Sequence, residues 1–346
     1  MSELRRDPIT GRWVCLAPGR AVRPEAAPQP PGGEATAMAD CPFCEGHEQR
    51  TPPELAAYRP DGGAADSPAW RVRVVPNLYP AFSFEGGPAD LGNALHAHGP
   101  ALGACEVIIH SPDHRRWLPY LADDQAELVM TTTWQRYLVH RVSGVGSVVA
   151  LYNHGREAGA SLAHPHGQIY STRLVGPVLD EEYRGAEAAH RAMGACVFCR
   201  MIEEESAQDV RVVARAGQFV AIAPYASRQP YECWILPTEH LADLGEAGED
   251  VAAALGRFLK VVLWKLTAAA SDVPLNWYIH SLPNAAGDWR ESYHWHLEIR
   301  PKLMDVASFE LATGTYINTL APEVAAATLA AEQDPPAGES EPRDPT

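Results

Sequence analysis

Short stretches of apolar residues, bordered by Gly-, Pro- and Asp-rich segments, predict β-strands along most of the chain. In the first half they lie near residues 71–75, 106–109 and 148–152. Because successive side chains of a strand point to opposite faces, each stretch can offer one face to a core. Comparable stretches follow at residues 275–280 and 293–299. The pattern therefore predicts strands separated by turns and loops.

Two longer stretches carry apolar residues at helical spacing. From residue 123 to about residue 140, Ala126, Met130, Trp134 and Leu138 recur at every fourth position, which places them on one side of a helix. The second stripe consists of Val251, Leu255, Phe258, Leu259, Val262 and Leu266. Each stripe predicts a helix that packs against the strands.

The order of these features repeats. Cys41-Pro-Phe-Cys44 returns as Cys196-Val-Phe-Cys199, and the stretch from Glu106 to His114 returns from Glu232 to His240 with the same spacing. The next histidine-containing strand follows 50 residues later in the first half and 54 residues later in the second. Since two separate motifs agree in order and spacing, we predict a tandem duplication of a unit of antiparallel strands with a packed helix, an α+β fold.

This duplication predicts three regions. We expect residues 1–185 to form the N-terminal repeat, with the histidine segment around residues 153–170 and one Cys/His group, and residues 186–324 to form the C-terminal repeat. The remaining residues, 325–346, are Ala-rich and then acidic and Pro-rich, so we expect at most one weak helix followed by a disordered tail.

Composition narrows the class of protein. No apolar run approaches the roughly 18 residues of a membrane span, and the first residues show no secretion signal, so we expect a cytoplasmic protein. The formal net charge of −16 argues against nonspecific binding to nucleic acid or membranes. It leaves open a small anionic ligand that local arginines and backbone N–H groups could hold.

The segment from Asn153 to Tyr170 carries the most specific chemistry. In an extended chain His164, His166 and Gln168 share one face, and Pro165 requires that the strand be interrupted there or lie at an edge. A Gly-rich approach that includes Ser161 can bring backbone N–H groups close to an anion. Two such histidines could also be a metal pair or polar surface residues. The combination with an amide favours a phosphoryl site, in which a neutral imidazole can attack phosphorus.

Cysteines and histidines also predict metal sites. Two thiolates and two imidazoles are the ligands of a closed tetrahedral zinc site, and the first half offers Cys41, Cys44, His114 and His164, although two reduced buried thiols are the alternative. The second half offers Cys196, Cys199, His240 and His294. An alternative second site, suited to iron or zinc, consists of Glu182, His280 and His296. The sequence does not choose between these two arrangements.

Several motifs together resemble the galactose-1-phosphate uridylyltransferase family of the histidine triad superfamily. They include residues 4–13, Cys41-Pro-Phe-Cys44, residues 75–80, residues 111–114, residues 153–168, residues 294–299 and residues 309–318. The resemblance implies two histidine-triad-like repeats that form an open antiparallel half-barrel, usually in a homodimer. It also implies a ping-pong reaction of galactose metabolism, in which UDP-glucose uridylylates a histidine and galactose 1-phosphate then takes the uridylyl group to give UDP-galactose.

Carried over by position, the resemblance makes His166 the nucleophile, Gln168 the phosphate-binding amide and the first Cys/His set the zinc ligands. The nucleotide contacts it implies are Asn77, Asn153, Arg20 and Arg23, and the hexose-phosphate contacts are Glu310, Tyr316 and Asn318. The sequence departs from some members at Ala160 and Leu162, where substrate selection is in question. The competing functions are a related nucleotidyl transferase or phosphorylase, such as one for an ADP-sugar, and a histidine-triad-like nucleotide-binding protein without turnover.

Overall fold

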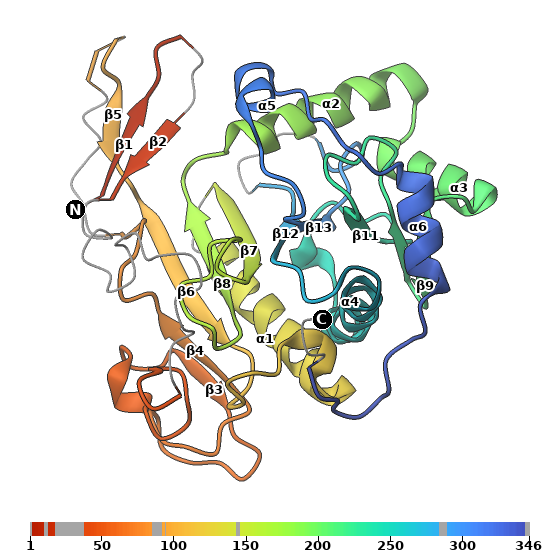
Figure 1. Cartoon of the computed structure of the whole chain (residues 1–346). Helices are drawn as coiled ribbons and strands as arrows, with labels where there is room; N and C mark the ends of the chain where they lie inside the picture. The colour runs from red at the N-terminus through yellow and green to blue at the C-terminus, as the bar shows by residue number, and fades with distance from the viewer. Residues whose placement is uncertain are drawn as a thin grey trace.

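The computed structural model describes residues 2–9, 13–17, 38–84, 92–93, 95–142, 146–283 and 289–342. Its main feature is an open ten-stranded antiparallel sheet (Figure 1). In spatial order its strands are β3 (Ala56–Tyr58), β4 (Val72–Pro76), β6 (Gly103–Ile109), β8 (His166–Thr172), β7 (Ser147–His154), β12 (Leu275–His280), β13 (His296–Pro301), β11 (Cys233–Pro237), β10 (Phe219–Ile222) and β9 (Val212–Ala216). A smaller sheet contains β2 (Trp13–Leu16), β1 (Glu3–Arg6) and β5 (His98–Pro100) in that order.

The large sheet has the same strand order when it is followed outward from its middle in either direction. One side runs β7, β8, β6, β4 and β3, and the other runs β12, β13, β11, β10 and β9, with matching order along the chain. The two sides meet where β7 pairs with β12. The predicted α+β fold with a repeated antiparallel unit is therefore confirmed. The expected boundary after residue 185 falls inside helix α2 (Pro177–Met193), and the domain limits stay a prediction.

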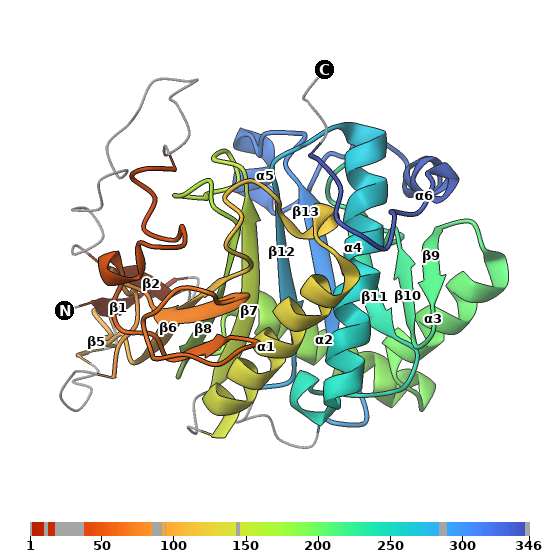
Figure 2. The same ribbon diagram turned by 90° about the horizontal axis from the view of Figure 1, so that it is seen from below.

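Two helices cover one face of the sheet. Helices α1 (Asp123–Val142) and α4 (Glu249–Ala270) run side by side across it (Figure 2). Their backbones approach closely at Gly256, where an added Cβ would lie 2.3 Å from the carbonyl oxygen of Ala126. The main apolar core lies between these helices and the sheet. No helix in the described ranges is both long and apolar enough to cross a membrane.

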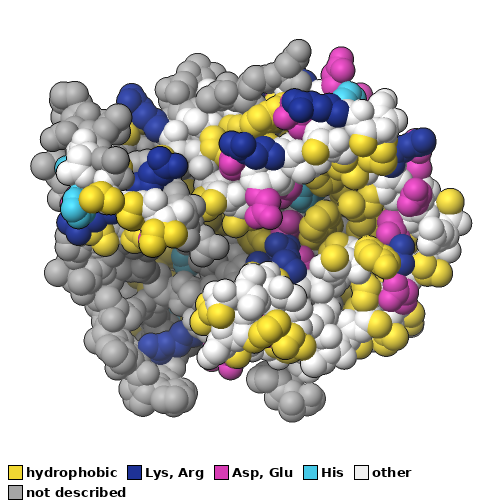
Figure 3. Space-filling model, turned by 90° about the horizontal axis from the view of Figure 1, so that it is seen from above, with side chains coloured by type: hydrophobic (Ala, Val, Ile, Leu, Met, Phe, Trp, Pro, Cys, Tyr) yellow, Lys and Arg dark blue, Asp and Glu magenta, His cyan; other side chains and the backbone are white. Residues whose placement is uncertain are grey.

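The opposite face of the sheet is covered differently in the two halves. In the second half, α2 and α3 (Val197–Gln208) pack their apolar residues against side chains of β10 and β11. In the first half, the loop around Cys41, Phe43 and Cys44 packs against Val75 of β4 and strand β6. Figure 3 shows this side of the molecule, where charged side chains of both signs gather near the middle.

For the end of the chain, residues 325–346, we expected at most one weak helix followed by a disordered tail. Helix α5 (Ser308–Thr313) is followed by α6 (Pro322–Ala331), which buries Ala325, Ala326 and Leu329 beside β9 and α4. The following residues are also held, because the buried ammonium group of Lys260 donates to the carbonyl oxygen of Pro336 at 2.8 Å. The one helix that we allowed for is therefore present, and disorder of the acidic residues after it stays a prediction.

Candidate functional site

Strand β8 begins at His166, directly after Pro165. Proline has no N–H group to donate to a neighbouring strand, so regular pairing starts after it. The strand lies inside the sheet, between β6 and β7. Of the two arrangements that the sequence allowed, the structure has the interruption at Pro165 and not the edge strand.

The imidazole of His166 is held in one tautomer. Its Nδ1 donates a hydrogen bond to the backbone carbonyl oxygen of His164 at 2.8 Å. A carbonyl oxygen can only accept, so Nδ1 carries the proton and Nε2 carries the lone pair of the neutral ring. The ring of Phe43 packs edge-on against it, with centroids 5.1 Å apart. This arrangement fixes the orientation of a nucleophilic nitrogen.

His166 and Gln168 line one cavity of about 610 Å³. The hydroxyl of Tyr170 donates to Oε1 of Gln168 at 3.1 Å, which leaves the amide N–H groups as the donors at this position. The cavity has apolar walls with a few polar groups, as is usual for small-ligand sites. The other lining residues include Asp40, Pro42, Phe43, Arg50, Thr51, Pro52, Val75, Asn77, Leu78, Tyr79, Val107, Leu151, Asn153, Gly159, Ser161 and Leu162.

The two predicted asparagine contacts lie in this cavity with their amide groups oriented. Oδ1 of Asn77 accepts from the backbone N–H of Tyr79 at 2.9 Å. Oδ1 of Asn153 accepts from the side-chain amide of Asn276, on β12, at 2.7 Å. In both residues the oxygen is occupied, so the N–H groups are the ones suited to an acceptor such as a phosphate or ribose oxygen.

Of the remaining predicted substrate contacts, one lines a cavity and two do not. Tyr316 lines a second cavity of about 510 Å³ beside the first. Glu310 accepts from the backbone N–H of Ala307 and so caps helix α5, and the amide of Asn318 donates to a carbonyl oxygen of the chain. Neither of these two residues lines the two cavities, because both are used in local structure, and their contact with a hexose phosphate stays a prediction. Arg20 and Arg23 lie outside the described residues.

The first predicted set of metal ligands comes together. Nδ1 of His114 lies 3.3 Å from Sγ of Cys44, and Nδ1 of His164 lies 3.6 Å from the same sulfur and 3.7 Å from Sγ of Cys41. Tetrahedral zinc bonds of ordinary length separate sulfur from nitrogen by about 3.5 Å. Nε2 of His164 donates to the carbonyl oxygen of Ser111 at 2.8 Å, which leaves Nδ1 unprotonated for a metal. The residues fit a zinc ion.

Burial of this Cys/His cluster gives a chemical reason why it would bind a cation. It raises the pKa of the Cys41 thiol to about 12 and lowers the pKa of His164 to about 4. Both groups are therefore neutral at pH 7 in the chain alone, and a thiolate is stable there only beside a positive charge. A bound metal ion would supply that charge and release the thiol protons.

The second half repeats the geometry. Nδ1 of His240 lies 3.3 Å from Sγ of Cys199, Nδ1 of His294 lies 3.6 Å from it, and Cys196 completes the group. Nε2 of His294 donates to the carbonyl oxygen of Pro237 at 2.9 Å, just as His164 does in the first half. These four residues fit a second zinc ion by the same distance and tautomer criteria.

The alternative second set also comes together, at a different place. Glu182 accepts from Nδ1 of His280 at 2.8 Å and from the hydroxyl of Tyr293 at 2.5 Å. Ligand atoms of Glu182, His280, His296 and Glu298 lie within 4.8 Å of one another. This set shares no residue with the second Cys/His group. The two arrangements between which the sequence did not choose are therefore both present as clusters of side chains.

Two charged residues in and beside the cluster of Glu182, His280 and His296 were not assigned from the sequence. Glu298 accepts from the hydroxyl of Tyr278 at 2.6 Å and forms an ion pair with Arg228, which also pairs with Glu232. Burial alone would raise the pKa of Glu298, but the nearby imidazole of His296, 3.8 Å away, and the charge of Arg228 hold this pKa far below its ordinary range. The cluster is thus largely satisfied by protein groups. The position of Glu298 two residues after His296 was the available signal, whereas nothing pointed to Arg228.

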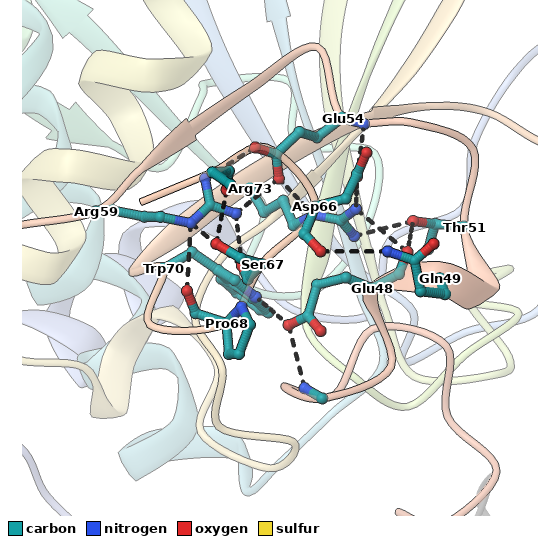
Figure 4. A network of polar contacts seen from close by, with 12 residues as sticks. Glu48, Gln49, Thr51, Glu54, Arg59, Asp66, Ser67, Pro68, Trp70 and Arg73 are labelled. Carbon is teal, nitrogen blue, oxygen red and sulfur yellow. Dashed lines mark hydrogen bonds and ion pairs between the residues drawn. The ribbon is translucent and has the colours of Figure 1, made fainter. Parts of the chain in front are cut away.

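A buried ion-pair network supports the wall of the first cavity (Figure 4). The guanidinium of Arg73, on β4, is 1% exposed and contacts Glu54 at 2.9 Å and Asp66 at 2.5 Å. It also donates to Oγ1 of Thr51 at 2.9 Å, and Thr51 lines the cavity. The network fixes the loop between Cys44 and β4, and it was not apparent from the sequence because its members are separated by many residues.

The repeated open sheet and its histidine strand define a protein of the histidine-triad-like α+β class. Residues 1–176 match the family described as galactose-1-phosphate uridyl transferase, N-terminal domain, and the chain belongs to this family. The resemblance inferred from the sequence motifs is therefore confirmed.

The relatives of this chain have different activities. An ADP-glucose phosphorylase of Arabidopsis thaliana is 32% identical over 331 residues, which are 93% of this chain and 90% of the relative. A galactose-1-phosphate uridylyltransferase of Thermotoga maritima is 27% identical over 342 residues, 95% of this chain and 98% of the relative. The crystal structure of the Arabidopsis thaliana phosphorylase with bound ADP-glucose superposes with a TM-score of 0.75 at 30% identity, covering 96% of this chain and all of the other. The family is thus one of nucleotidyl-transferring enzymes whose members differ in nucleotide and acceptor.

Proposed function

We propose that this protein transfers a nucleotidyl group from a nucleoside diphosphate sugar to a phosphate acceptor, through a covalent intermediate on His166. The observation that carries the proposal is the oriented imidazole. Nδ1 is anchored on the carbonyl oxygen of His164, and His166 lines a cavity together with Gln168, Asn77 and Asn153. A binding protein without turnover has no need of this oriented imidazole together with the neutral amide of Gln168 two residues further on.

The first step forms a phosphorus–nitrogen bond. The Nε2 lone pair attacks the α-phosphorus, the bond from this phosphorus to the bridging oxygen breaks, and the sugar 1-phosphate leaves with the electron pair. Both ring nitrogens are then substituted, so the ring is cationic, and the Nδ1 hydrogen bond to the His164 carbonyl stabilises that charge. Gln168 donates to a nonbridging oxygen as negative charge develops there.

The second step reverses the first with another phosphate. An oxygen of the acceptor attacks the same phosphorus, the phosphorus–nitrogen bond breaks and its electron pair returns to Nε2. The neutral imidazole is restored with its Nδ1 proton in place, so no other base is required. This is the ping-pong scheme expected from the family resemblance.

The substrate pair has two candidates. ADP-glucose as donor and inorganic phosphate as acceptor are favoured by the relative of 32% identity, whose activity is ADP-glucose phosphorolysis. UDP-glucose and galactose 1-phosphate, the pair inferred from the sequence motifs, are supported by the uridylyltransferases of the family. We rank the ADP-sugar first, because its relative is the more similar of the two over nearly the whole chain.

The metal ions in this proposal are structural zinc. The first Cys/His group holds the Cys41–Cys44 loop, and with it the Phe43 ring that packs on His166. The second group holds the equivalent loop of the C-terminal repeat. We also propose, from the family resemblance, that the enzyme is a cytoplasmic homodimer.

Intact mass spectrometry tests the function directly. The protein is incubated separately with ADP-glucose and with UDP-glucose, and then with phosphate or galactose 1-phosphate. An added nucleotidyl mass that a phosphate acceptor removes is the expected result, and His166→Gly should not acquire it while keeping its fold and metal. Absence of an adduct with either donor would contradict the proposal and favour a binding protein.

A further inference from the structure

The second cavity lies on the same face of the sheet as His166 and shares Leu151, Asn153 and Gly159 with the first cavity. Its volume is about 510 Å³. It extends from the shared residues across strands β12 and β13 of the C-terminal repeat, so it is a continuation of the nucleotide cavity toward the other half of the molecule.

Strand register places Arg300 in a row with the nucleophile. Asn276 pairs with Asn153 on one side and with Arg300 on the other. His166 lies one residue beyond the pair of Tyr152 with Gly167, and so stands beside Asn153. Four adjacent strands thus present His166, Asn153, Asn276 and Arg300, over three strand spacings or about 14 Å. An arginine side chain at one end and a phosphoryl group on His166 at the other can bridge this distance.

Arg300 is a partly buried cation without a carboxylate partner among the described residues. Its guanidinium lies over the ring of Tyr316, 5.5 Å from the ring centroid, and its buried Nε has no hydrogen-bond acceptor in the described part of the chain. By contrast, the shielded guanidinium groups of Arg73 and Arg228 each pair with two carboxylates. A desolvated guanidinium of this kind favours binding of an anion.

A second cation lines the same cavity. The ammonium group of Lys302 donates to the backbone carbonyl oxygen of Glu157, which tethers it to the loop before Ser161, and it has no carboxylate partner among the described residues. Glu157 also lines the cavity, and its carboxylate opposes the two cations in part. Two cations against one carboxylate leave a local positive charge in a protein whose net charge is −16.

We propose that Arg300 and Lys302 form the subsite for the acceptor phosphate, and for the same phosphate of the departing sugar 1-phosphate. This inference rests on the proposed nucleotidyl transfer and assigns the acceptor's place in it. An acceptor bound there presents its oxygen to the phosphorus on His166 from the side of the C-terminal repeat. Arg300 holds two nonbridging oxygens of the acceptor and Lys302 holds another, so both are binding residues.

The test separates discharge of the intermediate from its formation. The nucleotidyl adduct is prepared on wild type, Arg300→Gln and Lys302→Gln, the free donor is removed, and loss of the adduct is timed over a range of inorganic phosphate or galactose 1-phosphate concentrations. The acceptor concentration for half-maximal rate should rise at least about tenfold in each variant, because a charge-assisted hydrogen bond is lost. Arg300→Lys should recover part of the loss.

Arg215→Gln is the matched control, because Arg215 pairs with Asp209 on the surface at the far end of the sheet. Its discharge should match that of the wild type. An unchanged acceptor dependence in both Arg300→Gln and Lys302→Gln would overturn the subsite while leaving the nucleotidyl transfer intact. Absence of an adduct on the wild type would overturn both. Lys302 is exposed, so its variant decides the question even if Arg300→Gln folds poorly.

Discussion

The buried histidine beneath the nucleophile strand gives the sharpest prediction on stability. His110 follows β6, is 1% exposed and stacks on Tyr152 with ring centroids 5.2 Å apart. Neither of its ring nitrogens has a hydrogen-bond partner among the described residues. A Cβ on Gly167 would lie 3.0 Å from its Nε2, so the ring fills the space beside Gly167, the residue after His166. Such a site accepts only the neutral ring.

The expected magnitude follows from the pKa difference. Burial lowers the pKa of His110 to about 3, against about 6.5 in an unfolded chain. Because the folded state binds this proton less readily, its contribution to stability is complete above pH 6.5 and is lost as pH falls toward 3. Between pH 7.5 and pH 5 the loss is roughly 2 kcal/mol, from 1.5 pH units at about 1.36 kcal/mol each.

The perturbation is His110→Leu, which removes the titrating group. We expect the unfolding free energy of the variant, measured by urea denaturation at both pH values with the same zinc concentration, to gain roughly 2 kcal/mol relative to wild type on going from pH 7.5 to pH 5. His140→Leu is the control. His140 is also buried but bonds to Ser171 at 3.0 Å, so its loss should lower stability already at pH 7.5. Parallel pH dependence in His110→Leu and wild type would refute the idea of a neutral buried ring.

The remaining predictions concern the metal sites and the scaffold. Cys41→Ser should lose one equivalent of zinc and have a lower thermal midpoint. Cys196→Ser should lose the other equivalent and still form the nucleotidyl adduct. Elemental analysis and intact mass spectrometry check both variants, and an unchanged metal content would contradict the zinc site concerned. Gly256→Ala should cost roughly 1–3 kcal/mol or more in urea unfolding, because helices α1 and α4 must separate, and wild-type stability would contradict that contact. Arg73→Leu should cost about 3–5 kcal/mol, because Glu54 and Asp66 lose the guanidinium that pairs with them; a loss below 1 kcal/mol would refute the importance of the network.

What the sequence predicted well has a local physical cause. Strand alternation placed His166 and Gln168 on one face, and the missing N–H of Pro165 predicted the interruption before them. The Cys/His groups were found because their chemistry is restricted to few residue types and because the chain repeats them. The helix expected from residue 123 begins there and runs to Val142.

The features that the sequence could not predict depend on strand register and on contacts between distant segments. The sequence does not show that Arg300 lies in register with Asn276 and Asn153. That register is known only once β12 is seen to pair with both β7 and β13. The contacts of the C-terminal residues with Lys260 and with strand β9 could not be predicted from their own composition. Charged networks such as that of Arg73 are hidden for the same reason.

Comparison of the two halves supports the proposal that only His166 of the duplicated chain is a nucleophile. His296 occupies the position of His166, with its Nδ1 donating to the carbonyl oxygen of His294 at 3.1 Å and a phenylalanine ring 5.0 Å away. Two residues further on, however, the first half has the neutral Gln168 and the second has Glu298, which pairs with Arg228. A carboxylate at this place repels a phosphate and pairs with an arginine instead. The second half therefore lacks the pair of an imidazole and a neutral amide that the first half has, and Arg300, the next residue on that face, lines the second cavity, which adjoins the cavity of His166.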